Sequence, residues 1–422
     1  MATNPAINQT TAQITIPLGI PEIKVLGVET NEQGAIMITV ESTVEGTKCR
    51  QCGRHLTQSH GLDEPILIRH LPILGRQSYL RVRPRRYRCL DCQDKPTTTQ
   101  RLEWHTPKTP NTQAYERHLL LRMVNTTLAD LSIKEDIGYK ELEAVLDRWI
   151  ARKVDWRSLK RLRLLGLDEI ALRKGHRDFV VLVTAQLADG EVRIVAVLAD
   201  RKKETVRQFL EGIPRSIKRA IKTVCTDLSE GYINAVKEVL THAKIVADRF
   251  HVAKLYRHNA DTVRKQELRR LKKELPKAEY QKLKGSMWAF RKNSSDLKPE
   301  ETAKLERFFA HSPKAQQAYE YREQLTAIFE QDLSKAEAQA KIEQWQQEVK
   351  AAGVTCFEPF LKTLSNWMDE ITNYFLNRDT SGFVEGFNNK VKVLKRRCYG
   401  IFNLGHLFQR IFLDLEGYRL FA

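Results

Sequence analysis

The sequence predicts a multidomain α+β protein, and three observations lead to this prediction. Two Cys-x-x-Cys pairs lie in the first quarter of the chain, at Cys49 to Cys52 and at Cys89 to Cys92. Residues 163–260 alternate apolar strands with amphipathic helices. Residues from about 250 to 376 are rich in Lys, Glu, Gln and Ala and have a helical pattern almost throughout. At roughly 150 residues per domain, the 422-residue chain allows about three domains.

The charge balance is strongly basic. Lys and Arg total 70 against 52 Asp and Glu, which gives a formal net charge of +18, and 42% hydrophobic residues suffice for a folded core. The longest apolar run, Ile194–Ala199, is far too short to cross a bilayer, and the N-terminus lacks a secretory signal pattern. We therefore expect a cytoplasmic protein without a membrane partner. A basic excess of this size favours nucleic acid as the partner.

The basic residues are clustered, which disfavours the alternative of a charge spread evenly for solubility. One cluster is RVRPRRYR over residues 81–88, and another is VKVLKRR over residues 391–397. Clusters of this kind suit contacts with DNA phosphates, although they set no sequence preference. From the first cluster we expect DNA contacts by Arg83, Arg85, Arg86 and Arg88.

The four paired cysteines predict a structural zinc site. Each Cys-x-x-Cys pair can supply two thiolates to one tetrahedral ion, so the predicted ligands are Cys49, Cys52, Cys89 and Cys92. The alternatives are two disulfides or four unrelated buried thiols, but a protein without export signals keeps its thiols reduced, which disfavours disulfides. The long gap between the pairs fits an inserted β-hairpin made of ILIRHLP and SYLRVRPRRYRC. We predict a zinc ribbon over residues 45–105, preceded by an extended arm over residues 1–44.

Residues 106–155 predict three helices. Leu119 with Met123 marks the first and Leu128 with Leu131 a short second one, and Gly138 supplies a turn. The third helix has apolar residues at helical spacing: Leu142, Val145, Leu146, Trp149 and Ile150. A short helix, a turn and a longer helix are typical of a helix-turn-helix. A generic helical linker bundle remains the alternative.

The strand block predicts a ribonuclease-H-like α/β core that starts at residue 156. Three segments, RLLGLDEIAL, RDFVVLVTAQL and EVRIVAVLAD, have strand patterns, and ADG between the last two is a hairpin turn signal. A helix, the strand IKTVCTD, a second helix and the strand AKIVAD follow. Three antiparallel strands followed by α-β-α-β is the element order of a ribonuclease-H-like domain.

Acidic residues lie where apolar strands of this block end. Asp168 follows RLLGL and Asp227 follows IKTVCT, and in the predicted core these two strands are neighbours. The segment SGFVEGFNNKVKVLKRR predicts an amphipathic helix that can supply a third acid, Glu385. At 100° per residue, the polar face that Glu385 shares carries the remaining predicted DNA contacts, Asn388, Asn389, Lys392 and Arg396.

Three carboxylates suit Mg²⁺, which takes hard oxygen ligands and substrate phosphate oxygens. Two such ions, for which Mn²⁺ can substitute, support phosphodiester hydrolysis and transesterification at one site. The alternative treats Asp168 and Asp227 as ordinary turn residues and the Glu385 face as a solvated helix surface. Each acid alone fits that alternative, whereas the three in combination favour the metal site.

The sequence resembles the DDE transposases of the bacterial insertion-sequence family called ISL-three. The resemblance covers nearly the whole chain through the double Cys-x-x-Cys finger, LGLDEIAL, VCTDLSEGY, VADRFHVAK and SGFVEGFNNKVKVLKRRCYGIFN. It implies that Asp168, Asp227 and Glu385 are the acidic triad. It also implies that residues 256–376 are a helical insertion that divides the core into residues 156–255 and 377–422.

Several neighbouring residues have two interpretations. Glu169 and Glu230 could replace an acid as ligands, but Glu169 alternates to the other strand face and Glu230 fits a helix start. Asp248 and His251 resemble an element of related transposases that orients DNA or metal ligands, and Asp248 equally fits a helix N-cap. Trp288 could stack on an unpaired base, although we favour a core position for it.

The resemblance implies a DNA transposase. Its finger and helix-turn-helix would bind the terminal inverted repeats, and its core would cut the DNA and join it to target DNA. The protein would act as a homodimer on double-stranded DNA and be nucleoid-associated while bound. Two alternatives remain, a catalytically inactive DNA-binding regulator and a structure-selective ribonuclease-H-like nuclease.

Overall fold

The computed structural model describes residues 15–20, 22–159, 162–171, 179–380, 382–397 and 403–422, with side chains on the last helix before residue 398 described from Asn389 onward. The chain forms two compact units, residues 1–146 with 416–422 and residues 147–415. In the described part of the chain, no helix combines the length and the apolar character that a membrane crossing requires.

The first unit contains a four-stranded sheet with the order β1-β2-β7-β6. Its strands are β1 (Ile23–Thr30), β2 (Ile36–Ser42), β6 (Ile66–Ile73) and β7 (Arg76–Val82). The extended arm predicted for residues 1–44 is therefore wrong for residues 23–42, which form two of these strands. The reason is that β2 pairs with the distant β7, and Ile38 and Val40 pack on Ile68, Leu80 and Leu102. Pairing of this kind leaves no local sequence signal.

Short strands on either side of the β6–β7 hairpin carry the cysteines. They are β3 (Thr47–Lys48), β4 (His55–Leu56), β5 (Ser59–Leu62), β8 (Arg85–Arg88) and β9 (Thr97–Thr99). Cys49 and Cys52 lie between β3 and β4, and Cys89 and Cys92 lie between β8 and β9. The predicted hairpin insertion is confirmed, because β6 and β7 pair antiparallel between the two cysteine pairs.

Three helices follow where the apolar spacing predicts them, α1 (Gln113–Met123), α2 (Leu128–Glu135) and α3 (Tyr139–Trp149). Thr112 caps α1 by accepting a hydrogen bond from the backbone N–H of Tyr115. Thr127 caps α2 through the backbone N–H of Asp130 in the same way. The helix-turn-helix assignment of these elements stays a prediction.

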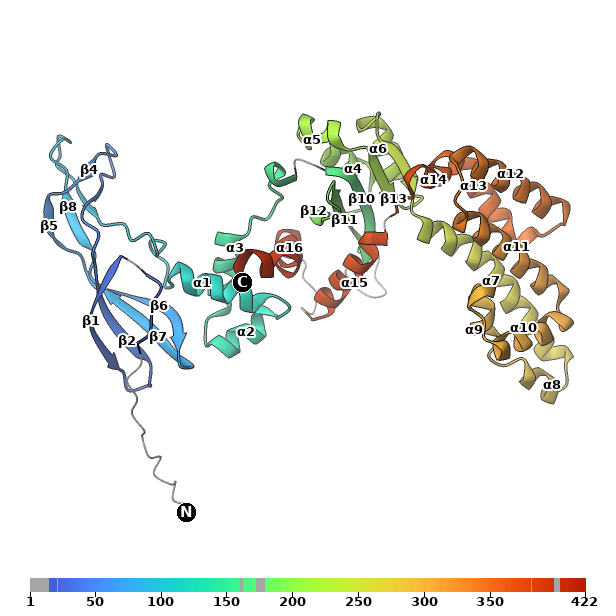
Figure 1. The fold of residues 1–422 in the computed structure, drawn as a ribbon, viewed down its shortest axis with the longest axis horizontal. Helices are drawn as coiled ribbons and strands as arrows, with labels where there is room; N and C mark the ends of the chain where they lie inside the picture. Colours follow the sequence, from blue (N-terminus) through green and yellow to red (C-terminus); the bar gives the residue numbers. More distant parts are fainter. Residues whose placement is uncertain (1–14, 21, 160–161, 172–178, 381, 398–402) are drawn as a thin grey trace, which may run out of the picture. The chain divides into compact units, whose positions relative to one another are not determined.

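The second unit contains a five-stranded sheet with the order β12-β11-β10-β13-β14 (Figure 1). Its strands are β10 (Leu162–Ala171), β11 (Phe179–Leu187), β12 (Val192–Leu198), β13 (Thr223–Thr226) and β14 (Lys244–Ala247). β10, β11 and β12 pair antiparallel, whereas β13 pairs parallel with β10 and β14 parallel with β13. The predicted element order is confirmed.

Helices cover both faces of this sheet. On one face Leu165, Leu167 and Val183 pack on α4 (Lys203–Glu211), α5 (Arg215–Ala220) and α6 (Glu230–Val239). On the other face Ile170, Leu182 and Ile194 pack on α15 (Gly382–Arg397) and on the first half of α16 (Leu404–Phe421). Alternate residues of β10 therefore point to different layers, as strand geometry requires.

Between β14 and α15 the chain is almost wholly helical, as predicted. The helices are α7 (Arg249–Glu274), α8 (Lys277–Lys282), α9 (Ser286–Arg291), α10 (Pro299–His311), α11 (Pro313–Glu330), α12 (Lys335–Ala351), α13 (Glu358–Thr372) and α14 (Tyr374–Asn377). Short 3₁₀ helices occur in this segment at Ser294–Asp296 and Thr355–Phe357, and another lies before β10 at Trp156–Leu159. Figure 1 shows α7 as a long helix that extends along this helical segment. Leu164, Cys225 and Val246 of the sheet belong to the same buried cluster as Val252 and Tyr256 of α7.

Candidate metal and catalytic site

Asp168 and Asp227 occupy equivalent positions on two paired parallel strands. The ladder between β10 and β13 ends with Leu167 opposite Thr226, so the next residue of each strand is an aspartate. Asp168 does not end its strand as predicted, because β10 continues to Ala171 by pairing with β11. What ends at Asp168 is the parallel pairing, and this brings the two carboxylates to one edge of the ladder.

Asp168 belongs to the sheet face that α15 covers. Asp168 lies opposite Leu182 in the antiparallel ladder, and Leu182 packs with Ile170 under α15 and α16. Glu169 points to the opposite layer, where its Oε1 accepts a hydrogen bond of 3.0 Å from the Tyr232 hydroxyl of α6. Strand alternation therefore separates Glu169 from Asp168, as the sequence predicts.

His251, in the first turn of α7, contacts Asp227 and a further aspartate, Asp248. Its Nδ1 lies 2.8 Å from Asp227 Oδ1 and 2.8 Å from Asp248 Oδ2. Asp248 also caps α7, because its side chain accepts a hydrogen bond of 3.2 Å from the backbone N–H of Phe250. The two interpretations of Asp248 are thus compatible, since one carboxylate caps the helix and contacts His251.

The electrostatic surroundings of His251 are strongly acidic. Burial alone would lower its pKa, but hydrogen bonds and charge interactions with Asp227 and Asp248 outweigh burial and raise the pKa to about 10. Ligand atoms of Asp168, Asp227 and His251 all lie within 4.8 Å of one another. The carboxylates of Asp168 and Asp227 supply oxygen ligands that fit a divalent cation such as Mg²⁺ or Mn²⁺.

The predicted helix around Glu385 exists as α15, whereas the side chains of Glu385 and Asn388 lie outside the described residues. Contacts at both ends fix how α15 runs along the sheet. Ahead of the helix, Asp379 forms an ion pair of 2.9 Å with Arg163 at the start of β10. Near the helix end, Lys395 donates a hydrogen bond to the backbone oxygen of Ala171, the last residue of β10. Glu385 lies between these two contacts in sequence, as Asp168 does on β10.

We expect Asp379→Asn to loosen the attachment of α15. Asp379 is buried, and it also accepts a hydrogen bond of 3.0 Å from Thr223 Oγ1, so its loss leaves Arg163 without a counter-charge. The Arg163 side chain is 39% exposed, which limits the cost to about 2 kcal/mol. Amide hydrogen exchange should rise over residues 379–397. The matched control is Asp332→Asn, because the fully exposed Asp332 pairs with Arg378 at the surface. Equal effects of both substitutions would contradict the predicted role of Asp379.

The described half of α15 has the predicted amphipathic arrangement. Val391 and Leu394 are buried against the sheet, whereas Asn389, Lys392 and Arg396 are exposed. The three exposed residues are thus available for contacts with a substrate. Their role in DNA binding stays a prediction.

The basic cluster of the first unit is partly engaged within the protein. Arg85 forms an ion pair of 2.6 Å with Glu41, and Arg83 donates to the backbone oxygen of Asp63. Arg86 donates to Thr97, and Arg88 contacts the His60 ring nitrogen. Arg83 is exposed and the other three are half-buried, so Arg83 is the most accessible of the four predicted DNA contacts.

The four paired cysteines converge as predicted. Their sulfur atoms lie 3.9 Å apart for Cys49 and Cys92, 3.7 Å for Cys52 and Cys89, and 3.6 Å for Cys89 and Cys92. A tetrahedral Zn²⁺ with Zn–S bonds of about 2.3 Å requires sulfur separations of about 3.8 Å. The backbone N–H groups of Cys52 and Gln51 lower the pKa of Cys49 to about 6, which favours the thiolate form that binds metal. The cluster therefore fits a structural zinc ion.

One favoured interpretation is wrong. Trp288, for which a core position was preferred, is 64% exposed on α9. The short α9 directs its neighbours Ala289 and Phe290 into the core instead. Sequence reasoning also missed the contacts of Asp379 with Arg163 and Thr223, because nothing local marks a carboxylate that pairs across more than 150 residues.

Comparisons with known proteins identify the family of the chain. The family model for DDE transposases of the ISL3 type matches residues 165–411, which is more than half of the chain. The model for the zinc-finger of transposase IS204/IS1001/IS1096/IS1165 matches residues 45–92. The transposase for insertion sequence element IS1001 of Bordetella parapertussis is 26% identical over 89% of this chain and 90% of its own length.

Two further proteins are more distantly similar. The transposase for insertion sequence element IS1557 of Mycobacterium tuberculosis is 22% identical over 67% of each chain. The solved Drosophila P element transposase strand transfer complex matches with a TM-score of 0.41 at 11% identity, over 72% of this chain and 91% of that one.

Proposed function

The chain belongs to the ISL3 family of DDE transposases, and from this membership we propose that Asp168, Asp227 and Glu385 are its catalytic acids. It is a DNA transposase of an insertion sequence. The observation that supports the triad most strongly is the proximity of Asp168 and Asp227 just beyond the end of one parallel ladder, where their ligand atoms lie within 4.8 Å of each other. The packing of α15 on the same sheet face supports Glu385 as the third acid.

The proposed chemistry is Mg²⁺-dependent strand cleavage followed by strand transfer. Two bound ions, Mg²⁺ or Mn²⁺, would activate the attacking oxygen and stabilise the leaving oxygen. The three carboxylates would hold the ions, and His251 with Asp248 would position Asp227 through the contacts described above. Water first attacks the phosphodiester at the element end and releases a 3′-hydroxyl. That hydroxyl then attacks a target phosphodiester, forms the new bond and releases the target 3′-oxygen.

The remaining parts would bind and hold the DNA. We assign residues 156–255 and 377–422 to a ribonuclease-H-like core and residues 256–376 to a helical insertion. The zinc-binding module over residues 45–105 and a helix-turn-helix over residues 106–155 would bind the terminal inverted repeats. Asn388, Asn389, Lys392 and Arg396 would contact phosphates near the cut. Two element ends must be joined, which favours a homodimer on DNA.

Strand cleavage of labelled element ends tests this function. Purified protein with Mg²⁺ should cut the strand at the junction between the inverted repeat and the flanking DNA, leaving a 3′-hydroxyl. A DNA-binding regulator would bind these ends without cutting them. A structure-selective nuclease would cut a branched duplex of unrelated sequence as readily as the repeat end. Either result would overturn the proposed function.

The position of Glu385 can be tested without the transposition reaction. We expect Fe²⁺ in the metal site, with ascorbate and peroxide, to cut the polypeptide close to residues 168, 227 and 385, because hydroxyl radicals react near the bound ion. Mass spectrometry of the fragments locates the cuts. An excess of Mg²⁺ should suppress them, which identifies the site as the source. Cuts near 168 and 227 without one near 385 would show that the proposed third acid lies elsewhere.

A further inference from the structure

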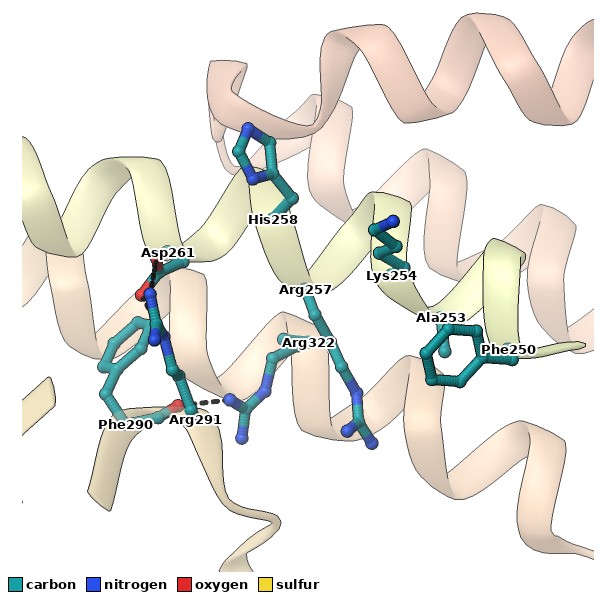
Figure 2. A pocket seen from close by; sticks show the side chains of 9 residues that line it. All are labelled: Phe250, Ala253, Lys254, Arg257, His258, Asp261, Phe290, Arg291 and Arg322. Atoms are coloured by element: carbon teal, nitrogen blue, oxygen red, sulfur yellow. Dashed lines mark hydrogen bonds and ion pairs between the residues drawn. The ribbon is translucent and has the colours of Figure 1, made fainter. Parts of the chain in front are cut away.

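A basic cavity of about 460 Å³ lies in the helical segment beside α7 (Figure 2). One wall is α7 itself, and the others come from α9 and α11. Four cationic side chains line the cavity against one carboxylate, Asp261: they are Lys254, Arg257, Arg291 and Arg322. Such an excess of positive charge in a hollow favours an anionic ligand.

Two of the four cations are already neutralised within the protein. Arg291 forms an ion pair of 2.9 Å with Asp261, and Arg322 forms one of 2.6 Å with Glu323. Arg322 also donates to the backbone oxygen of Phe290, a contact drawn in Figure 2. These two arginines therefore connect α7, α9 and α11 around the cavity.

Lys254 and Arg257 are different, because neither forms an ion pair within the described residues. Lys254 is exposed on α7. Arg257 donates from Nη2 to the neutral Asn293 Oδ1 at 2.8 Å, while its Nε is buried without a hydrogen-bond partner. An unsatisfied buried guanidinium nitrogen costs stability unless a ligand accepts its hydrogen bond. The arrangement thus provides two cations, one of them a planar fork, for an anion such as phosphate.

The cavity starts beside the metal site, because Phe250, which lines it, directly precedes His251 on α7. His251 contacts Asp227, and Lys254 and Arg257 follow it by three and six residues on the same helix. At 1.5 Å per residue they lie about 4.5 and 9 Å farther along the axis. A strand that leaves the metal site along α7 would therefore pass Lys254 first and Arg257 next.

An aromatic side chain also lines this cavity. Phe250 lines it from the first turn of α7 and is 57% exposed. Figure 2 shows Phe250 on the same helix as Lys254 and Arg257, at its N-terminal end. An exposed ring next to cations that can bind the backbone is the combination on which unpaired bases stack.

We propose that this cavity binds the DNA strand next to the cut, with Lys254 and Arg257 on two backbone phosphates and Phe250 stacked on an unpaired base. The inference rests on the proposed function, because it takes the strand from the metal site along α7. It adds to that function a binding site for a single-stranded segment within the helical region. The helical segment thereby becomes part of the substrate-binding surface.

Binding of a labelled oligo-dT of about 10 nucleotides to the full-length protein tests this proposal, since single-strand sites span about 4–16 nucleotides. Fluorescence anisotropy without divalent metal keeps the measurement independent of cleavage. We expect Lys254→Ala with Arg257→Gln to weaken binding about 25-fold at 0.1 M salt and to lower the salt slope by about 1.4, the value for two phosphate contacts. Phe250→Ala should weaken binding about tenfold without changing that slope.

The matched control removes the same charge elsewhere on the same helix. Lys272→Ala with Lys273→Ala changes two exposed lysines of α7 that do not line the cavity, and it should leave oligo-dT affinity within about twofold. If Arg257→Gln impairs folding, Lys254→Ala alone should still weaken binding about fivefold, because Lys254 is exposed. Equal weakening by the cavity and control variants would overturn the proposal.

A blunt duplex of the same length separates the two parts of the proposal. Phe250→Ala should leave duplex affinity unchanged, because paired bases offer no free face for stacking, and an equal loss on both DNAs would overturn stacking. The outcome is also distinguishable from failure of the proposed function. A protein that binds oligo-dT through this cavity but cuts no element end would refute the function alone. A protein that cuts element ends, with cavity variants that bind normally, would refute the cavity alone.

Discussion

Asp227→Asn is expected to lower the rate of Mg²⁺-dependent strand cleavage about 10³-fold while leaving the affinity for element ends unchanged. The substitution removes a carboxylate that lies within 4.8 Å of Asp168 and contacts His251. Metal ions contribute several kcal/mol to stabilising the charge of such a transition state, and about 1.4 kcal/mol corresponds to a factor of ten in rate. Single-turnover cleavage of a labelled end measures the rate, and anisotropy without divalent metal measures the affinity.

Glu230→Gln is the matched control for this prediction. Glu230 lies three residues beyond Asp227, is exposed, and is the first residue of α6. Its substitution therefore removes the same charge close to Asp227. We expect cleavage to stay within about threefold, because an exposed helix-start carboxylate contributes only a few tenths of a kcal/mol to about 1 kcal/mol of helix stability. If both variants lost activity alike, the local charge and not the ligand position would be responsible. If Asp227→Asn cut normally, the proposed site would be wrong.

Much of the catalytic sheet could be predicted because its signals are local. The apolar runs of β10 to β14 and the turn between β11 and β12 are visible within a few residues, and the antiparallel and parallel pairing follows from the order of strands and helices. The proximity of Asp168 to Asp227 could be predicted because their strands are neighbours, although β10 continues past Asp168 and only its parallel pairing with β13 ends there. The amphipathic winding of α15 correctly separated the buried Val391 from the exposed Lys392.

Features that depend on distant partners could not be predicted. The residues of β1 are mostly exposed, and the pairing of β2 with β7 attaches both strands to a sheet, so the residues of the predicted arm carry no local signal of this sheet. Trp288 is a large aromatic residue of the kind that usually lies in a core. The helix α9 is so short, however, that its packing against α10 and α11 decides which of its side chains is buried. The cavity cations Lys254 and Arg257 follow His251 at helical spacing, which is a sequence signal. Their meaning appears only when α9 and α11 close the cavity.

Loss of the zinc ligand Cys89 is expected to unfold the cysteine-bearing strands while the four-stranded sheet stays folded. Around the four sulfur atoms, the buried cluster contains only Leu56 and Tyr87 besides cysteines, which is too small a core to hold β3, β4, β8 and β9 without a metal. The neighbouring sheet has its own core of Ile38, Ile68 and Leu80. Zinc binding stabilises comparable small modules by roughly 10 kcal/mol or more at neutral pH, so its loss should exceed the stability of this module.

Hydrogen exchange and metal analysis together decide this prediction. Cys89→Ser, or treatment with a strong chelator, should remove the bound zinc and increase exchange over residues 45–62 and 85–99, with little change over residues 36–42 and 66–82. Cys356→Ser is the matched control, because Cys356 is a half-buried cysteine of the second unit and does not belong to the four-cysteine cluster. It should retain the full zinc content. If exchange over residues 85–99 stayed low after the zinc was removed, side-chain packing and not the metal would hold these strands.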